Sequence, residues 1–188
     1  ETTRVSVASG GDEAGNSSYK PALSASGRWV AFDSFASDLV EADGNGDPDV
    51  FVRDRKLRVT TRVSVTSDEA EADGSSFTAS LSASGRWVAF YSFATNLVDD
   101  DTNSSADVFV RDRKLGLTTR VSVATGGAEG DGASDWPSIS RNGRWVAFES
   151  GATDLVADDA NADFDVFVHD RKTGATARVS VTSAGVEA

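Results

Sequence analysis

Apolar and polar positions follow one pattern along this chain, and the pattern returns every 58 residues. Its simplest marker is Arg-Val-Ser-Val, in which valine alternates with polar residues as in a β-strand with one buried face. The marker occurs four times, at 4–7, 62–65, 120–123 and 178–181. A fixed period of this length indicates a repeat architecture in which each copy is one supersecondary unit.

Three further apolar runs lie between successive markers. The first follows a loop rich in Gly, Asp and Ser, at 19–24, 77–82 and 135–140. The second, Arg-Trp-Val-Ala-Phe, occupies 28–32, 86–90 and 144–148, and the third, which starts with Val-Phe-Val, occupies 50–54, 108–112 and 166–170. The second and third runs do not alternate, which predicts strands buried on both faces. We therefore predict an all-β chain with four short strands per period in meander order.

Burial of both faces decides the expected architecture. A single meander covers one face of its strands, whereas sheets stacked radially around a channel cover both, and that arrangement is the β-propeller. We predict one repeat domain, 1–188, with three four-stranded antiparallel blades. Their expected bounds are 8–65, 66–123 and 124–181, preceded by an extra outer strand at 1–7.

Composition narrows the classes of function. The 188 residues carry a net charge of −12 and are 39% hydrophobic, which suits a folded acidic domain and argues against nucleic-acid binding. The chain has no cysteine, which excludes disulfides and thiolate metal sites, and no apolar run is long enough to span a membrane. His169, the one histidine, stands where other copies have Arg53 and Arg111, and we expect it at the surface.

An acidic loop precedes each Val-Phe-Val run and is the strongest candidate for chemistry. Its oxygen-bearing side chains lie at alternate positions and recur in all three copies, whereas the residues between them differ from copy to copy. The three sets are Asp43, Asn45, Asp47 and Asp49; Asp101, Asn103, Ser105 and Asp107; and Asp159, Asn161, Asp163 and Asp165. Such side chains converge in a tight loop, and Ca²⁺ prefers hard oxygens. We predict three Ca²⁺ sites, of which the second is weakened by Ser105. An acidic surface turn without metal is the alternative.

A family resemblance adds to this interpretation. Gly-Arg-Trp-Val-Ala-Phe at 27–32, which follows a Ser-x-x-Gly turn, and Asp-Val-Phe-Val-Arg-Asp at 49–54 each recur twice, with His in place of Arg in the last copy of the second. They resemble the TolB-type, WD40-like β-propeller repeat of bacterial secreted proteins, over essentially the whole chain. The resemblance implies an extracellular or periplasmic location and often a six-bladed ring. The acidic loop is similar to the calcium loops of integrin-type propeller repeats, but two residues shorter.

The number of blades raises a question of assembly. Three blades are too few to close a ring, and an open set leaves two apolar faces uncovered. We therefore predict a homodimer that completes one six-bladed ring. The segments 4–7 and 178–181 are copies of the same strand, so one of them is expected to fill an outer slot in the partner. A fragment excised or engineered from a longer propeller is the alternative.

Positions that differ between the copies are candidates for ligand binding. They lie just before the expected innermost strands, near a channel mouth where a glycan or peptide would bind: Tyr19, Lys20, Phe77 and Trp136. Asp33 and Glu149 would form an acid pair only if the ring brought them together. The function we predict is a calcium-stabilised extracellular scaffold or binding module without catalytic activity. A hydrolase or lyase acting on polysaccharide or peptide at the channel mouth is the alternative.

Overall fold

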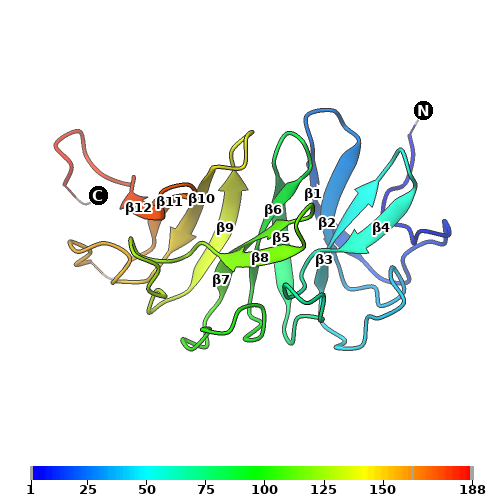
Figure 1. The fold of residues 1–188 in the computed structure, drawn as a ribbon, viewed down its shortest axis with the longest axis horizontal. Coiled ribbons are helices and arrows are strands. Elements are labelled where there is room, and N and C mark those ends of the chain that lie inside the picture. Colours follow the sequence, from blue (N-terminus) through cyan, green and yellow to red (C-terminus); the bar gives the residue numbers. More distant parts are fainter. Residues whose placement is uncertain (1, 162, 187–188) are drawn as a thin grey trace.

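The strands of this chain form three separate antiparallel sheets. The computed structural model describes residues 2–161 and 163–186, and within these ranges it contains three four-stranded sheets and no helix. Figure 1 shows the sheets standing in a row in sequence order, from the blue N-terminal end to the red C-terminal end. The predicted all-β chain of three blades is confirmed.

Each blade is a meander, because strands that are neighbours in the sheet are also neighbours in sequence. Blade 1 consists of β1 (Ser18–Leu23), β2 (Trp29–Ser34), β3 (Asp49–Asp54) and β4 (Val59–Arg62). Blade 2 consists of β5 (Ser76–Leu81), β6 (Trp87–Ser92), β7 (Asp107–Asp112) and β8 (Leu117–Arg120). Blade 3 consists of β9 (Ser134–Ile139), β10 (Trp145–Ser150), β11 (Asp165–Asp170) and β12 (Ala175–Arg178).

The fourth strand of each blade ends where the Arg-Val-Ser-Val pattern begins. In blade 1, β4 ends at Arg62, and the backbone N–H of Val63 still donates to the Val50 carbonyl of β3 at 2.8 Å before residues 64–65 leave the sheet. Val63 and Val65 are nevertheless buried, and the backbone N–H of Val50 donates to the Ser64 hydroxyl at 3.0 Å. The strand expected over the whole of 62–65 was therefore wrong, because a buried connection between blades shows the same alternation as a half-buried strand.

The N-terminal copy of the motif is not a strand either. Residues 2–7, where we expected an extra outer strand, pair with the rest of the chain only through a bridge between Val7 and Glu13. The turn that follows is held instead by side chains of blade 1. Thr60 Oγ1 donates to the carbonyl of Val7 at 2.5 Å, and Arg53 Nη1 donates to the carbonyl of Ala8 at 3.1 Å.

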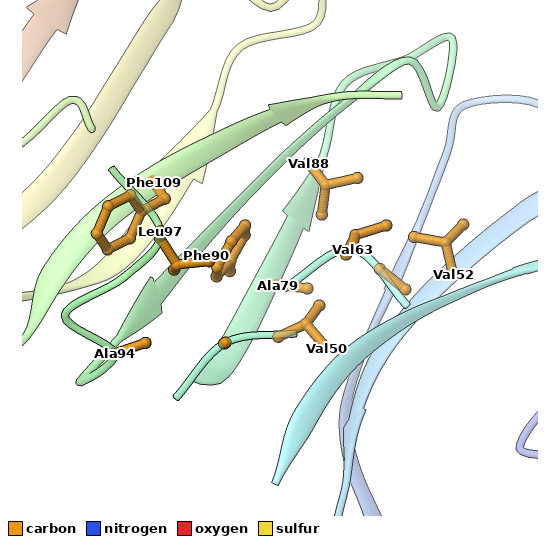
Figure 2. Close-up of a cluster of buried hydrophobic side chains, with 11 residues drawn as sticks. Val50, Val52, Val63, Ala79, Val88, Phe90, Ala94, Leu97 and Phe109 are labelled. Atoms are coloured by element: carbon orange, nitrogen blue, oxygen red, sulfur yellow. The ribbon is translucent and has the colours of Figure 1, made fainter. Parts of the chain in front are cut away.

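Two of the three clusters of buried hydrophobic side chains in the described part of the chain lie between blades, and the third, around Phe32 and Phe51, lies within blade 1. Figure 2 shows Val50 and Val52 of β3 beside Val88 and Phe90 of β6, so that one sheet face closes on the next. A second cluster joins blades 2 and 3 in the same way. The far face of blade 3 has no such cover among the described residues, and Trp145 is consequently 42% exposed.

A tryptophan at the start of the second strand joins each blade to the next. Trp29 of blade 1 lies against Gly85 of blade 2, where an added Cβ would come within 2.3 Å of the indole. The guanidinium groups of Arg28 and Arg113 lie 4.5 and 4.1 Å from the centroid of this ring, which is cation–π distance. Trp87 repeats the contact against Gly143.

Replacing the glycine at this joint should separate the effect of packing from the effect of backbone strain. Gly85 and Gly27 have φ of 71° and 67°, so alanine at either position suffers left-handed strain of roughly 1–2 kcal/mol. Only Gly85→Ala also pushes a methyl group into Trp29, and overpacking of this kind costs about 1–3 kcal/mol more. Urea denaturation measures both variants. Equal losses of stability would show that the joint does not hold the blades together.

Candidate metal centre

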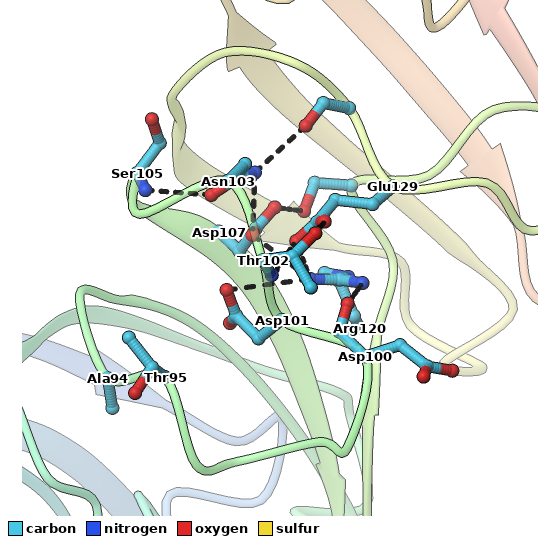
Figure 3. A network of polar contacts seen from close by, with 12 residues as sticks. Ala94, Thr95, Asp100, Asp101, Thr102, Asn103, Ser105, Asp107, Arg120 and Glu129 are labelled. Atoms are coloured by element: carbon cyan, nitrogen blue, oxygen red, sulfur yellow. Dashed lines mark hydrogen bonds and ion pairs between the residues drawn. The ribbon is translucent and has the colours of Figure 1, made fainter.

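Two clusters of carboxylates form where the acidic loops end. Asp43, Asp49 and Glu71 form one cluster, and Asp101, Asp107 and Glu129 form the other, each with one oxygen per residue within 4.8 Å of the others. Figure 3 shows the second cluster, in which Asp101 and Asp107 of one loop face Glu129 of the segment leading to blade 3. Each cluster therefore links an acidic loop to the connection between blades.

The last aspartate of the loop is also the first residue of the third strand, and it is fully buried. Asp107 Oδ1 accepts a hydrogen bond from the Ser122 hydroxyl at 2.5 Å, and its Oδ2 accepts one from Arg120 Nη1 at 3.3 Å. Ser64 and Arg62 hold Asp49 in the same way. The serine and arginine both belong to the Arg-Val-Ser-Val motif, which explains why those two polar residues recur.

The first aspartate of the loop is buried but poorly satisfied. The side chain of Asp101 is 1% exposed, and neither of its carboxylate oxygens has a hydrogen-bond partner. Arg120 Nη1 lies 3.7 Å from its Oδ1. Burial, followed by the charge of Asp107, raises the pKa of Asp101 to about 6. Asp43 Oδ1 is likewise buried without a hydrogen bond. A buried carboxylate in this condition favours a cation that completes its coordination.

The middle positions of the loop make further hydrogen bonds, and one of them reaches the cluster: Asn103 Nδ2 donates to Asp107 Oδ2 at 3.2 Å. Asn103 Oδ1 accepts the backbone N–H of Ser105 at 2.7 Å, while its Nδ2 donates to the Gly130 carbonyl at 2.8 Å. Asn45 makes the equivalent bonds in blade 1, and Asp47 Oδ1 accepts the Ser75 hydroxyl at 2.8 Å. These side chains shape the turn and anchor it to the next connection.

The third loop is described except for residue 162. Arg178 Nη1 lies 3.3 Å from Asp159 Oδ1 and 3.1 Å from Asp165 Oδ2. Asn161 Oδ1 accepts the backbone N–H of Asp163 at 2.9 Å, as in the other two turns. Glu187, the counterpart of Glu129 in the repeat, lies outside the described residues.

Sequence reasoning missed the glutamate and the arginine of the cluster. Both recur with the 58-residue period, and that recurrence was the available signal. Arg120 Nη1 is also ion-paired with Glu129, so a guanidinium already lies among the three carboxylates. One positive and three negative groups leave a formal charge of −2, which a divalent cation would balance. Carboxylate oxygens on Asp101, Asp107 and Glu129 fit Ca²⁺ as ligands.

The candidate ligand-binding residues lie around an irregularity of the innermost strands. Lys20 and Trp136 have φ of 49° and 47°, at the point where β1 and β9 shift register. Lys20 Nζ lies 4.5 Å from the centroid of the Trp136 ring, so the contact joins the first blade to the third. Tyr19 and Phe77 are linked through Phe35, with ring centroids 6.1 and 6.3 Å apart.

The two carboxylates considered as an acid pair have different neighbours. Asp33 is buried, and its Oδ1 accepts the backbone N–H of Thr78 in the next blade at 3.4 Å. Burial raises the pKa of Asp33. Glu149 is exposed. Burial raises the pKa of Asp135, and the charge of Glu149 raises it further.

The expectation of a surface position for His169 was wrong. The side chain is buried, with 6% exposure, and its Nδ1 lies 2.9 Å from Thr176 Oγ1. Arg53 and Arg111 hydrogen-bond the equivalent threonines, so the histidine keeps a structural contact made in all three blades. Burial lowers the pKa of His169.

Comparison with known proteins supports the fold. No protein-family model matches the chain. No curated protein matches it significantly. Among solved structures, TolB from Acinetobacter baumannii matches with a TM-score of 0.51 and 18% identity, covering 94% of this chain and 35% of TolB. A putative TolB from Agrobacterium tumefaciens matches with a TM-score of 0.56 and 18% identity, covering 86% of this chain and 48% of that protein.

A third similar structure is the β-propeller domain of the Trilobed protease from Pyrococcus furiosus. It matches with a TM-score of 0.51 and 10% identity, covering 86% of this chain and 41% of that one. Likeness at such low identity shows the fold alone, and the fold is that of β-propeller proteins. The chain spans between about a third and a half of the length of these structures. In the described residues, no helix is long and apolar enough to cross a membrane.

The metal-free protein should lose stability as the pH rises through about 6. The folded pKa of Asp101 is about 6 and its ordinary value is 3.8, so the folded state holds this proton more tightly than the unfolded state does. The resulting stabilisation is fully present below about pH 4 and is lost as the pH rises through 6. Asp101→Asn cannot ionise, so in EDTA it should raise Tm near neutral pH and change it little near pH 4.

Asp99→Asn is the matched control, because it makes the same chemical change at an exposed position of the same loop. Its Tm difference from wild type should not depend on pH in this way. A lower Tm of metal-free Asp101→Asn at neutral pH would contradict the prediction. It would show that other groups in the fold already compensate the charge of Asp101.

Proposed function

We propose that this chain is a calcium-stabilised β-propeller scaffold or binding module that acts outside the cytoplasm and has no catalytic activity. The observation that supports it most is Asp101, whose two buried oxygens lack hydrogen-bond donors beside Asp107 and Glu129. Hard oxygen ligands from irregular connections suit the variable geometry of Ca²⁺ better than Mg²⁺, which demands a near-octahedral shell and keeps its waters.

The role of the ion would be structural. Asp101 lies in the connection between β6 and β7, and Glu129 lies in the segment that leads from β8 to β9. An ion bound by both would tie two long connections together. Fixing such connections costs conformational entropy, and a ligand that binds only the folded state offsets that cost.

A location outside the cytoplasm follows from this proposal. Calcium sites in extracellular modules bind with Kd of about 10⁻⁴–10⁻³ M, which suits compartments with high calcium. A cluster in which Arg120 already neutralises part of the charge is expected to bind at this weak end. The resemblance to TolB-type repeats points the same way. A calcium titration by calorimetry that gave submicromolar affinity would contradict this argument.

The end blades support a proposal about assembly. Trp145 of blade 3 occupies the position that Trp29 and Trp87 hold at the joints between blades, but it remains exposed. At the other end, Leu23 of blade 1 is 64% exposed. Because the blades are repeats, the two ends are complementary, and two copies of three blades would close a ring of six.

The binding role is assigned to the aromatic side chains of the innermost strands. Tyr19 and Trp136 are about half exposed, and the Lys20 amine rests on the Trp136 ring. Exposed aromatic rings beside a positive charge suit a glycan or an acidic peptide. A glycan and peptide array that gave no signal would remove this part of the proposal.

Calcium should raise Tm, and EDTA should lower it. At ten times its Kd, one bound ion stabilises the folded state by about 1.4 kcal/mol. Asp101→Asn should remove the contribution of the second site, whereas the exposed Asp99→Asn should keep it. Differential scanning calorimetry with CaCl₂, with MgCl₂ and with EDTA provides the measurement. Identical wild-type curves in CaCl₂ and EDTA would reject the calcium proposal.

Assembly should depend on the exposed tryptophan at the end of the row. Trp145→Glu places a charge on the proposed contact between copies and should convert a dimer into a monomer, because an interface does not tolerate an unpaired buried charge. Leu115→Glu is the control, since Leu115 is 66% exposed on the hairpin between β7 and β8 of the middle blade, which belongs to neither end of the row. Sedimentation velocity at micromolar concentration distinguishes the species. A compact wild-type monomer would refute ring closure by two copies.

A further inference from the structure

Four arginines gather at the hairpin between β3 and β4, in a chain whose net charge is −12. They line a pocket of about 220 Å³ together with two residues of the N-terminal segment. The lining residues are Thr3, Arg4, Val5, Arg53, Arg55 and Arg58. Like charges at this density repel one another unless something neutralises them. The repeat allows this hairpin to be compared with its two copies.

The first difference between the copies is Arg58. It adopts φ of 58°, a left-handed conformation that glycine adopts at the equivalent positions, Gly116 and Gly174, with φ of 66° and 72°. The side chain of Arg58 makes no hydrogen bond or ion pair within the described structure. The fold therefore does not need an arginine here, and glycine would close the turn with less strain.

The second difference concerns the buried arginine of β3. Arg111 of blade 2 uses Nη1 to bind Thr66 and Thr118, and its Nη2 is paired with Glu69. Arg53 of blade 1 makes the same Nη1 contacts, with Ala8 and Thr60, but Gly11 stands where blade 2 has Glu69. Arg53 is only 6% exposed, so its charge is buried without the carboxylate that its counterpart has.

Among the described residues, the other charges near the pocket leave an excess of positive charge. Glu13 is ion-paired with Arg4. Asp54 is engaged by Arg28 through two hydrogen bonds, at 2.9 and 2.6 Å. Arg55 Nη1 donates to the Gly27 carbonyl at 2.8 Å. Burial lowers the pKa of Arg53, and the charge of Arg58 lowers it further.

We propose that this pocket binds a small oxyanion, a phosphate or sulfate group carried by a soluble molecule, through Arg4, Arg53 and Arg58. Guanidinium groups present paired donors that match the oxygens of such anions. The volume is below that of pockets for drug-sized ligands and suits one charged group. The anion takes the place that Glu69 occupies in blade 2.

Titration with inorganic phosphate in EDTA tests the proposal, with chloride at the same ionic strength as reference. Wild type should bind phosphate saturably in NMR or calorimetric titrations. Arg58→Gly should weaken binding about tenfold, because it removes a charge-assisted hydrogen-bond donor. The same variant should be at least as stable as wild type, since glycine relieves the left-handed strain, so loss of binding cannot be attributed to unfolding.

Two further variants use the repeat as an internal control. Gly11→Glu supplies the carboxylate that blade 2 has and should abolish phosphate binding. An added Cβ at Gly11 meets nothing within 4 Å, but φ of 101° makes the substitution cost roughly 1–2 kcal/mol. The fold should be kept, because Glu69 itself has φ of 65° in blade 2. Lys56→Gln removes one charge from the same hairpin without touching the pocket and should leave binding unchanged. Absence of saturable binding by wild type, equal affinity in Arg58→Gly, or an equal loss in Lys56→Gln would overturn the proposal.

The source of the group can be assigned in the same experiment. Glucose 6-phosphate should compete with inorganic phosphate if the natural ligand is a soluble ester. Cosedimentation with vesicles that contain phosphatidic acid, lost in Arg58→Gly, would contradict a soluble ligand and assign the pocket to a lipid headgroup.

Discussion

The structure depends on covering both faces of every sheet. The middle strands of each blade carry apolar residues on both sides, so no blade is stable alone and each must lie against another. Besides the apolar core between the sheets, successive blades meet at one joint, where Trp29 fits only because Gly85 lacks a side chain and Arg113 lies over the ring. Repetition of this joint sets a constant relation between successive blades, as a propeller requires. The uncovered Trp145 shows where the series stops in the described chain.

Most of the fold could be predicted from the sequence because the repeat supplies independent copies of the same signal. The non-alternating runs predicted doubly buried strands, and they are β2, β3 and their counterparts. The alternating motif was wrongly predicted to be a strand throughout. The Ser64 hydroxyl accepts the backbone N–H of Val50, which a neighbouring strand would otherwise bind. The position of His169 was also predicted wrongly. Its burial depends on the turn after Val123, which is distant in sequence and is bonded to Thr176 of the outer strand.

The candidate metal centre could be predicted only in part, because proximity in the fold differs from proximity in the loop. Alternation along the loop suggested that all four side chains of a set converge. The first and last aspartates do, and Asn103 Nδ2 donates to Asp107 Oδ2 at 3.2 Å, but the same amide also bonds the loop's own backbone and the next connection. The third carboxylate, Glu129, comes from beyond β8, and Arg120 comes from the strand itself. A pattern of Asp and Asn in a loop does not distinguish residues that shape the turn from residues that bind a ligand.

Features shared by all three copies maintain the fold, so specific function is better sought where the copies differ. Arg53, Arg111 and His169 all contact a threonine of the outer strand, and that shared contact is structural. The residue opposite them is free to change, because the turn that carries it is held by its backbone. Blade 2 uses this freedom to place Glu69 against Arg111, whereas blade 1 leaves Arg53 without a carboxylate and adds Arg58 at a strained position. Strain and uncompensated charge at one copy of a repeat have no structural benefit, which is the physical reason for treating that copy as a site.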